Sequence, residues 1–333
     1  MSRPADIYSL VADIGGTNTR VALAEGTRLL TDTVTRYANK DYAGLEAVLS
    51  AYIDAQKVTC KGACVALAGP VTDGRGVMTN LNWEIDEVTL ARATGSNAAY
   101  LLNDLQAQGH ALGSLPEGAV SQLVSGQTPR PLDSQTKLVI GVGTGFNVAP
   151  VYETRGGRHV PPSESGHSNL PVRNAQELRL AQHFETTHGF PAIEDMLSGR
   201  GLERIYTWIG IEAGEPRDAS AAEIMAGFEN GTDARARAAA GMFVQMLGTV
   251  AGNLALIHLP FGGVYFSGGV ARALAKHFGP LGFEHSFRDK GRFAQFMAQF
   301  DVGVIEDDFA ALTGCANYLA AVEKSPNNGP SQV

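Results

Sequence analysis

Hydrophobic positions along the chain follow two spacings in turn, which predict strands interleaved with helices. Residues 7–12 form a short apolar run, a glycine pair follows, and residues 20–24 alternate polar and apolar side chains. This order is typical of a strand, a tight turn and a second strand. Over residues 42–56 the apolar side chains instead recur at helical spacing, at Leu45, Val48, Leu49, Tyr52 and Ile53.

The same interleaving continues along the chain. Short apolar runs predict strands at 63–67, 98–102, 137–141, 148–152, 264–266 and 302–305. Helices are predicted after a cap at Asp86, after capping boxes at Asn174 with Glu177 and Ser220 with Glu223, up to about 112, and over 233–257 and 309–322. Strands that alternate with helices indicate an α/β protein. Two blocks, 13–18 and 141–147, each join strands through glycines, so we expect two similar halves with a cleft between them.

One segment, 238–259, has 22 residues without a charge, which is long enough to cross a membrane. Gln245, Asn253 and His258 are polar, however, and the many alanines and glycines insert weakly into lipid. We therefore expect a helix buried in a protein core. Gly248 and Gly252 are expected to allow close packing against another element.

Composition narrows the classes of protein that fit. A length of 333 residues suggests about two domains. The net charge of −8 disfavours nonspecific binding to nucleic acid or to an anionic membrane, because both require a positive field. The 39 glycines exceed the usual share of about 7% and suggest sharp turns or close backbone approaches. Cys60, Cys64 and Cys315 lack zinc-site spacing, so we expect reduced, buried thiols in a cytoplasmic protein.

The first candidate for chemistry is the glycine turn at 13–18. Gly15 and Gly16 allow successive backbone N–H groups to face one anion, and Thr17 and Asn18 add side-chain donors. Asp13 ends the strand, where its carboxylate is suited to orient a hydrated Mg²⁺ on a phosphate. The alternative is an ordinary hairpin with a glycine turn.

A second glycine turn follows the strand predicted at 137–141. Gly143, Thr144 and Gly145 superficially resemble a dinucleotide-binding turn, but Phe146 stands at the position of its last glycine and a strand is predicted next. We therefore expect a second phosphate-binding hairpin. A third turn, at 268–269, leads from a strand into a helix and is suited to contact a nucleotide.

Polar residues elsewhere are candidates for acid–base chemistry and sugar binding. Asp104 follows Asn103 at the C-terminal end of a strand, where open α/β sheets bind ligands, and is suited to accept a proton from a hydroxyl. The alternative for Asp104 is a helix N-cap. Glu164, His167 and Glu194 offer donors and acceptors for sugar hydroxyls. A metal pair at Glu164 and His167 is the rival interpretation, but no further His or Cys lies at ligand spacing.

Taken together, these segments resemble the bacterial glucokinase family, within the superfamily of sugar kinases, Hsp70 and actin. The resemblance extends over about residues 8–322, and the cysteine cluster of the related zinc-binding sugar kinases is absent. The segments that carry it are, in order, 13–18, Met78-Thr79-Asn80 with Trp83, Asn103-Asp104, 143–145, 164–167, Leu197-Ser198-Gly199, 252–256, Ser267-Gly268-Gly269 and Lys290-Gly291-Arg292-Phe293.

The resemblance implies a two-domain, actin-like ATPase (ribonuclease H-like) fold. Each domain would be a mixed sheet flanked by helices, with the active site in the cleft between them. The smaller domain would comprise 1–114 and 308–325, the larger 115–307, and 326–333 would be a disordered tail. The resemblance also implies a cytoplasmic homodimer.

The activity implied is ATP-dependent phosphorylation of the 6-hydroxyl of glucose to glucose 6-phosphate, with Asp104 as general base. The sugar would be held by Asn80, Asn103, Asp104, Glu164, His167 and Glu194, with the backbone at Gly145. Mg–ATP would be held by Asp13, Gly15, Gly16, Thr17, Asn18, Gly143, Thr144, Gly268 and Gly269. Asp13 would reach Mg²⁺ through water, and no side chain would be a direct structural ligand of a metal.

The chain departs from the family pattern at several positions. Asn147 stands where the family usually has glycine, and we expect its backbone to tolerate a left-handed turn and its side chain to lie near the phosphates. Ser163 and Ser165 flank Glu164 where the family usually has glycines. The segment 307–311 lacks the usual Asn-Pro-Gly.

Three alternatives follow from these departures and from the glycine turns. The first is a kinase that prefers another hexose or an amino sugar. The second is a sugar- or nucleotide-binding regulator with weak catalysis. The third alternative is a dehydrogenase, which requires a strand, a turn and a helix around Gly141, so a hairpin there would exclude it.

Overall fold

The structure is a computed structural model that describes residues 7–78, 81–127 and 135–324. The chain forms two compact units. The first comprises residues up to 117, 154–162 and those from 307 onward, and the second comprises 118–153 and 163–306. The domains expected from the sequence place residues 154–162 in the larger domain, whereas the structure groups this segment with the first unit. Asn80 and the tail at 326–333 lie outside the described residues.

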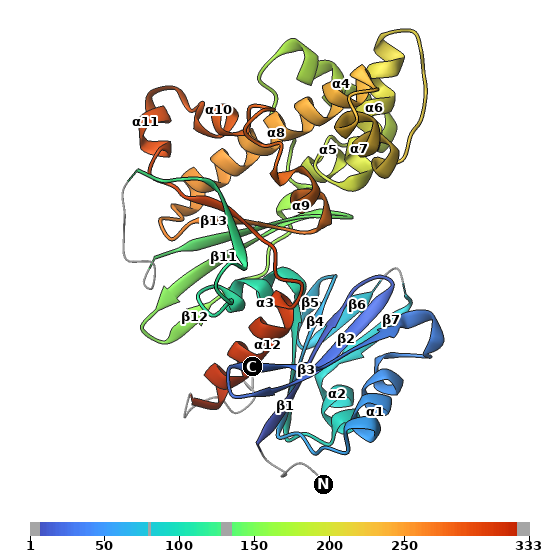
Figure 1. The fold of residues 1–333 in the computed structure, drawn as a ribbon, viewed down its shortest axis with the longest axis vertical. Coiled ribbons are helices and arrows are strands. Elements are labelled where there is room, and N and C mark those ends of the chain that lie inside the picture. Colours follow the sequence, from blue (N-terminus) through green and yellow to red (C-terminus); the bar gives the residue numbers. More distant parts are fainter. Residues whose placement is uncertain (1–6, 79–80, 128–134, 325–333) are drawn as a thin grey trace. The chain divides into compact units, whose positions relative to one another are not determined.

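The first unit is built on a five-stranded sheet of order β3-β2-β1-β4-β8 (Figure 1). β1 and β2 pair antiparallel, as do β2 and β3, whereas β1, β4 and β8 run parallel. Ile14 lies beside Leu67, and Leu67 beside Asn103, so the three parallel strands end at one edge. The strands are β1 (Tyr8–Ile14), β2 (Asn18–Glu25), β3 (Arg28–Ala38), β4 (Gly62–Leu67) and β8 (Ala98–Asn103).

Helices cover both faces of this sheet, because successive side chains of a strand point to opposite faces. Leu10 of β1 packs in one hydrophobic cluster with α1 (Leu45–Gln56) and α2 (Glu87–Thr94). Val11 packs in another with α3 (Asp104–Ala111) and α12 (Ala310–Lys324). Burial on both faces explains why β1 and β4 are apolar at nearly every position.

Two smaller features complete the first unit. A three-stranded antiparallel sheet is formed by β5 (Val71–Thr72), β6 (Arg75–Met78) and β7 (Trp83–Asp86). A short 3₁₀ turn, η1 (Asn39–Asp41), follows β3.

All three cysteines, Cys60, Cys64 and Cys315, belong to the first unit as buried free thiols, as expected from the sequence. Burial raises the pKa of the Cys60 thiol to about 11. Burial, together with the neighbouring Cys315, also raises the pKa of Cys64.

The second sheet has the order β12-β11-β10-β13-β14-β9. β10 and β11 pair antiparallel, whereas β10, β13 and β14 run parallel, so the order of the first sheet is repeated. The predicted pair of similar halves is confirmed at this level. The strands are β9 (Val120–Val124), β10 (Lys137–Val142), β11 (Phe146–Thr154), β12 (Gly157–His159, within the segment 154–162), β13 (Val264–Ser267) and β14 (Val302–Ile305).

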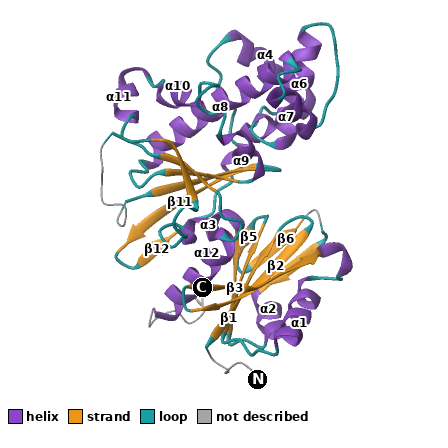
Figure 2. Ribbon diagram, viewed as in Figure 1, coloured by secondary structure: helices purple, strands orange, loops and turns teal. Residues whose placement is uncertain are grey.

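The helices of the second unit gather around one long helix, α8 (Figures 1 and 2). Most of them contribute to a single hydrophobic core with the sheet. They are α4 (Ala175–His188), α5 (Ile193–Met196), α6 (Gly199–Glu212), α7 (Ala221–Glu229), α8 (Ala234–His258), α9 (Gly269–Ala275), α10 (Phe283–Arg288) and α11 (Ala294–Met297), with 3₁₀ turns η3 (Ser165–His167) and η4 (Gly291–Phe293).

The uncharged segment at 238–259 lies in α8. Among the described residues α8 alone is long and apolar enough to cross a membrane, yet 67% of its most apolar window is buried within the structure. A Cβ at Gly248 would lie 2.5 Å from the Phe283 carbonyl oxygen, and one at Gly252 would lie 2.4 Å from that of Phe287. α8 is therefore a core helix that packs closely on α10 at the two predicted glycines.

The predicted strands and helices are present, and most of the predicted caps are formed. Asp86 accepts from the Thr89 amide at 2.8 Å, and Ser220 and Glu223 form a reciprocal capping box. The predicted box at Asn174 is wrong in its second half. The Glu177 carboxylate reaches one residue further and accepts from the Arg173 amide at 2.7 Å. The strands β3, β5 to β7, β9 and β12 and the helices α5, α6, α10 and α11 have no counterpart among the predicted elements.

Candidate functional site

The first glycine turn joins β1 to β2 and is held by Asn39, a residue that the sequence did not single out. The Gly15 amide donates to the Asn18 carbonyl at 3.0 Å across the turn. The Asn39 side chain donates to the Gly15 carbonyl and accepts from the Thr19 hydroxyl, each at 2.8 Å. Asn39 is only 2% exposed, so its amide is a buried clamp on the turn. No local pattern identifies this role, because the contact joins residues 24 positions apart.

Asp13 lies directly opposite Arg20 in the register of β1 and β2. Its carboxylate is 3.5 Å from the Arg20 guanidinium. Burial raises the pKa of Asp13, and the Arg20 charge opposes that rise. Asp13 therefore places a half-buried carboxyl group beside the turn.

Asp104 is the first residue of α3, at the C-terminal end of β8. Asn103, not Asp104, is the helix cap: its side-chain oxygen accepts from the Leu105 amide at 3.0 Å, and Gln106 completes a capping box. The alternative interpretation of Asp104 as the cap is therefore wrong. Asn103 also donates to the Gly69 carbonyl at 3.0 Å, which leaves one of its amide N–H groups for another partner.

The electrostatic surroundings of Asp104 favour its protonated form. Burial, with the like charge of Asp13 as the next cause, raises the pKa of Asp104 to about 7. Hydrogen bonds from the Leu105 and Asp104 amides and the Asn103 side chain oppose this rise. A carboxyl group with a pKa near neutrality is suited to exchange protons with a substrate.

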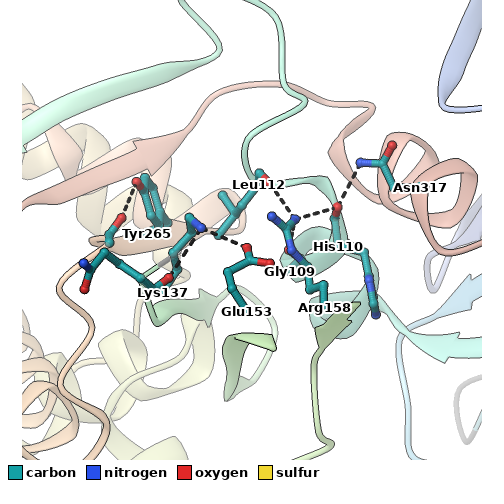
Figure 3. Close-up of polar contacts among 10 residues, drawn as sticks. Gly109, His110, Leu112, Lys137, Glu153, Arg158, Tyr265 and Asn317 are labelled. Atoms are coloured by element: carbon teal, nitrogen blue, oxygen red, sulfur yellow. Dashed lines mark hydrogen bonds and ion pairs between the residues drawn. The ribbon is translucent and has the colours of Figure 1, made fainter. Parts of the chain in front are cut away.

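The helix that carries Asp104 is held at both ends by the segment 154–162. Gln106 donates to the Val160 carbonyl at 2.8 Å. At the other end the Arg158 guanidinium donates to the carbonyls of Gly109, His110 and Leu112 (Figure 3). These carbonyls lie at the C-terminus of α3, where the last carbonyls of a helix have no intrahelical N–H partner and a nearby cation is favourable. The Asn317 side chain also donates to the His110 carbonyl, at 2.9 Å.

The second glycine turn joins β10 to β11 as a hairpin, as predicted. The Gly143 amide donates to the Gly145 carbonyl at 2.9 Å, and β11 continues as a strand from Phe146. The hairpin excludes the dehydrogenase alternative, which requires a helix here. At its base, the Lys137 ammonium is 3.0 Å from the Glu153 carboxylate (Figure 3).

Three other segments approach this hairpin. Glu194 accepts from the Phe146 amide at 2.9 Å, and a Cβ at Gly145 would lie 2.5 Å from the same carboxylate oxygen. The Gly199 amide donates to the Gly143 carbonyl at 2.9 Å. Gly268 has a φ of +98°, and a Cβ there would lie 2.4 Å from the Val142 carbonyl oxygen. The positive φ and the close approach both require glycine at 268.

The loop with Glu164 and His167 lies on the same hairpin. The Gly166 Cα faces the Phe146 carbonyl so closely that a Cβ would lie 2.1 Å from it. The Ile193 amide donates to the Ser168 carbonyl at 2.9 Å, which ties the loop to α5. Within the second unit, the structure thus brings together Glu164, His167, Glu194 and the turn at 143–145, with Glu164 and His167 exposed.

The expectation for Asn147 is corrected. Asn147 pairs with Gly141 in the β10–β11 ladder and does not adopt a left-handed backbone. Its side chain bonds to the loop at 163–165, not to the turn at 143–145. The strand ladder sets this direction, because a ladder residue of β11 turns its side chain to one face of the sheet.

The remaining site residues divide between the two units. Asp13, Gly15, Gly16, Thr17, Asn18, Asn103 and Asp104 belong to the first unit, and Gly143, Thr144, Gly145, Glu164, His167, Glu194, Gly268 and Gly269 belong to the second. The predicted sugar ligand Asn80 falls outside the described residues. In the described ranges, no group of three or more His, Cys, Asp or Glu side chains is placed to hold a metal ion.

Comparison with known proteins decides the family. A sequence model of the family described as Glucokinase matches residues 10–322. The chain belongs to the glucokinase family. The glucokinase of Pectobacterium atrosepticum is 31% identical over 321 residues, covering 95% of this chain and 98% of its own. The glucokinase of Chromobacterium violaceum is 34% identical over 328 residues, covering 97% of this chain and 92% of its own.

Solved structures agree with this family. A glucokinase from an Antarctic psychrotroph superposes with a TM-score of 0.84 at 26% identity, covering 94% of this chain and 98% of its own. A ROK hexokinase from Thermus thermophilus, at 21% identity and a TM-score of 0.66, covers 95% and 99% respectively and shares the fold. The fold is thus the predicted actin-like ATPase fold, and membership of the glucokinase family makes the chain an ATP-dependent hexose kinase, a transferase.

Proposed function

We propose that this glucokinase transfers the γ-phosphoryl group of Mg–ATP to the 6-hydroxyl of glucose, with Asp104 as the general base. The observation that carries the proposal is the position of Asp104 at the C-terminal edge of β8, where its pKa is raised to about 7. A general base is most effective when its pKa lies near the working pH.

In the proposed reaction, the sugar oxygen forms a bond to the γ-phosphorus as the bond to the β-phosphate oxygen of ATP breaks. The hydroxyl proton moves to the Asp104 carboxylate, and ADP leaves. Phosphoryl transfer of this kind depends on positioning and charge neutralisation more than on covalent chemistry. The capping box and Arg158 hold α3, and with it Asp104, in a fixed orientation.

The sugar hydroxyls are proposed to bind Asn80, Asn103, Asp104, Glu164, His167 and Glu194 and the backbone at Gly145. Carboxylates accept from hydroxyls, whereas the amide and imidazole groups can also donate. Glu194 supports this role because one carboxylate oxygen already accepts from the Phe146 amide, which fixes the direction of the other oxygen.

The phosphates are proposed to lie against the two glycine hairpins, at 13–18 and 143–145, with Gly268 and Gly269. Asp13 is the residue proposed to face Mg²⁺, through water, because its carboxylate stands half-buried beside the first turn. The metal would neutralise charge on the phosphates.

The test is Asp104→Asn, which keeps the shape of the side chain but cannot accept the proton. We expect kcat to fall about 10²–10⁴-fold, the usual contribution of a general base. Glucose affinity, measured by calorimetry, should change far less. Near-normal turnover of a variant that melts like the wild type would contradict the role of Asp104.

A different preferred hexose or amino sugar is the second proposal, favoured by Ser163 and Ser165 on either side of Glu164. A panel of sugars compared by kcat/KM tests it, since specificity is a ratio of these values. Glucose ranking first would reject it. A cytoplasmic homodimer is proposed from the family resemblance, and light scattering of the purified protein tests its oligomeric state.

A further inference from the structure

Asn147 makes an unusual set of contacts for a strand residue. Its side-chain oxygen accepts from the Val148 amide at 2.8 Å and from the Ser165 amide at 3.1 Å. Its side-chain nitrogen donates to the Ser163 carbonyl and lies 3.5 Å from a carboxylate oxygen of Glu164. One amide group thus contacts three consecutive residues of the loop, and both of its ends are used.

The loop itself is ordered by short-range bonds among its serines. The hydroxyls of Ser163 and Ser165 form a hydrogen bond, and the Ser165 amide donates to the Ser163 hydroxyl at 3.2 Å. The Ser168 hydroxyl donates to the Ser165 carbonyl at 2.7 Å. Asn147 is the side chain of β11 that anchors this ordered loop to the strand.

The side-chain amide of Asn147 is suited to orient the carboxylate of Glu164. Glu164 is exposed, so its long side chain would otherwise sample several rotamers. A donor beside one of its carboxylate oxygens favours one rotamer. The nitrogen is the amide end that faces this carboxylate, because the other end accepts from two backbone N–H groups.

We propose that Asn147 is a positioning residue that presents the Glu164 carboxylate to the sugar, and so sets affinity for sugar and not for ATP. The inference rests on the proposed role of Glu164 in sugar binding. It assigns the side chain of Asn147 to the sugar loop, whereas Gly143 and Thr144 of the preceding turn are proposed to hold phosphate.

The decisive variant is Asn147→Asp. The aspartate keeps the acceptor for the Ser165 and Val148 amides but replaces the donor with a negative oxygen near Glu164. We expect the KM for glucose to rise about ten-fold or more, the usual effect of losing a hydrogen bond to a charged group. We expect kcat and the KM for ATP to stay within about two-fold.

Three controls accompany it. Asn230→Asp makes the same chemical change at an exposed C-cap of α7 and should alter neither KM. Glu164→Gln tests the sugar role by itself. In the double variant, Asn147→Asp should have little further effect, because the coupling acts through Glu164. Melting temperatures show that each variant is folded.

The outcomes separate the two proposals. If Glu164→Gln raises the KM for glucose but Asn147→Asp leaves it unchanged, or raises the KM for ATP instead, the positioning role of Asn147 is overturned and the sugar role of Glu164 stands. If Glu164→Gln leaves the KM for glucose unchanged, the sugar role fails and the inference fails with it. A selective rise in the KM for glucose in both single variants, without additivity, supports both.

Discussion

At the scale of single residues, the sequence indicates candidate residues for the chemistry but not the groups that hold them in place. Asp104 and Asn103 stand out because polar residues follow an apolar strand. Asn39 and Arg158 do not, since their contacts join residues 24 and 48 positions apart. The contacts of Asn147 are equally hidden in the sequence, because its side chain bonds to loop residues 16 and 18 positions away and not to the turn just before it.

The raised pKa of Asp104 predicts a pH dependence of activity. The protonated carboxyl group cannot accept the hydroxyl proton, so kcat/KM for glucose should fall as the pH drops through about 7. Asp13→Asn removes a like charge that raises this pKa. The pH at which kcat/KM falls should therefore be lower in that variant. A pH–rate profile that stays flat from pH 8 to pH 5.5 would argue against Asp104 as the base.

At the scale of elements, periodicity, together with helix caps, predicts the longer helices α1, α4, α8 and α12 and the buried strands, but not α6, which has 14 residues. It missed β5 to β7 because two-to-four-residue strands carry too few positions to show alternation. It missed β3 because this strand holds only one buried residue, Thr33, among exposed and half-buried positions. Elements whose stability comes from pairing with neighbours leave the weakest local signal.

The close packing of α8 on α10 predicts opposite effects for two glycines of one helix. Gly252→Ala should destabilise the protein by about 1–3 kcal/mol, because its Cβ would lie 2.4 Å from the Phe287 carbonyl oxygen. Gly241→Ala is the matched control: no atom lies within 4 Å of its Cβ position, so alanine should stabilise by up to about 1 kcal/mol. Urea unfolding measures both. Equal effects would contradict the packing argument.

The bonds of Arg158 to the end of α3 predict a stabilising role for the segment 154–162. Arg158→Met keeps the apolar stem but removes the donors to three carbonyls, so the free energy of unfolding should fall by about 1–3 kcal/mol. Arg155→Met, at an exposed position of the neighbouring turn, should change it by less than about 0.5 kcal/mol. An unchanged unfolding curve for Arg158→Met would show that α3 does not depend on this contact.

At the scale of the whole molecule, the repeated strand order explains why the sequence could predict two similar halves. In each sheet an antiparallel hairpin is followed by parallel strands, and each hairpin turn contains two glycines. The sequence shows the two hairpins and the alternation of strands and helices. It does not show that residues 154–162, which lie between two segments of the second unit, belong to the first unit, because no change in composition marks this segment.

The distribution of the thiols has a practical consequence. All three cysteines are buried in the first unit, and the second unit has none. A thiol reagent reacts with thiolates, and burial hinders its access to all three thiols in the folded state. Burial also raises the pKa values of Cys60 and Cys64, which lowers their thiolate fraction. The rate of alkylation in native buffer therefore reports how often the first unit opens transiently. Mass spectrometry can follow this alkylation over time without any engineered label.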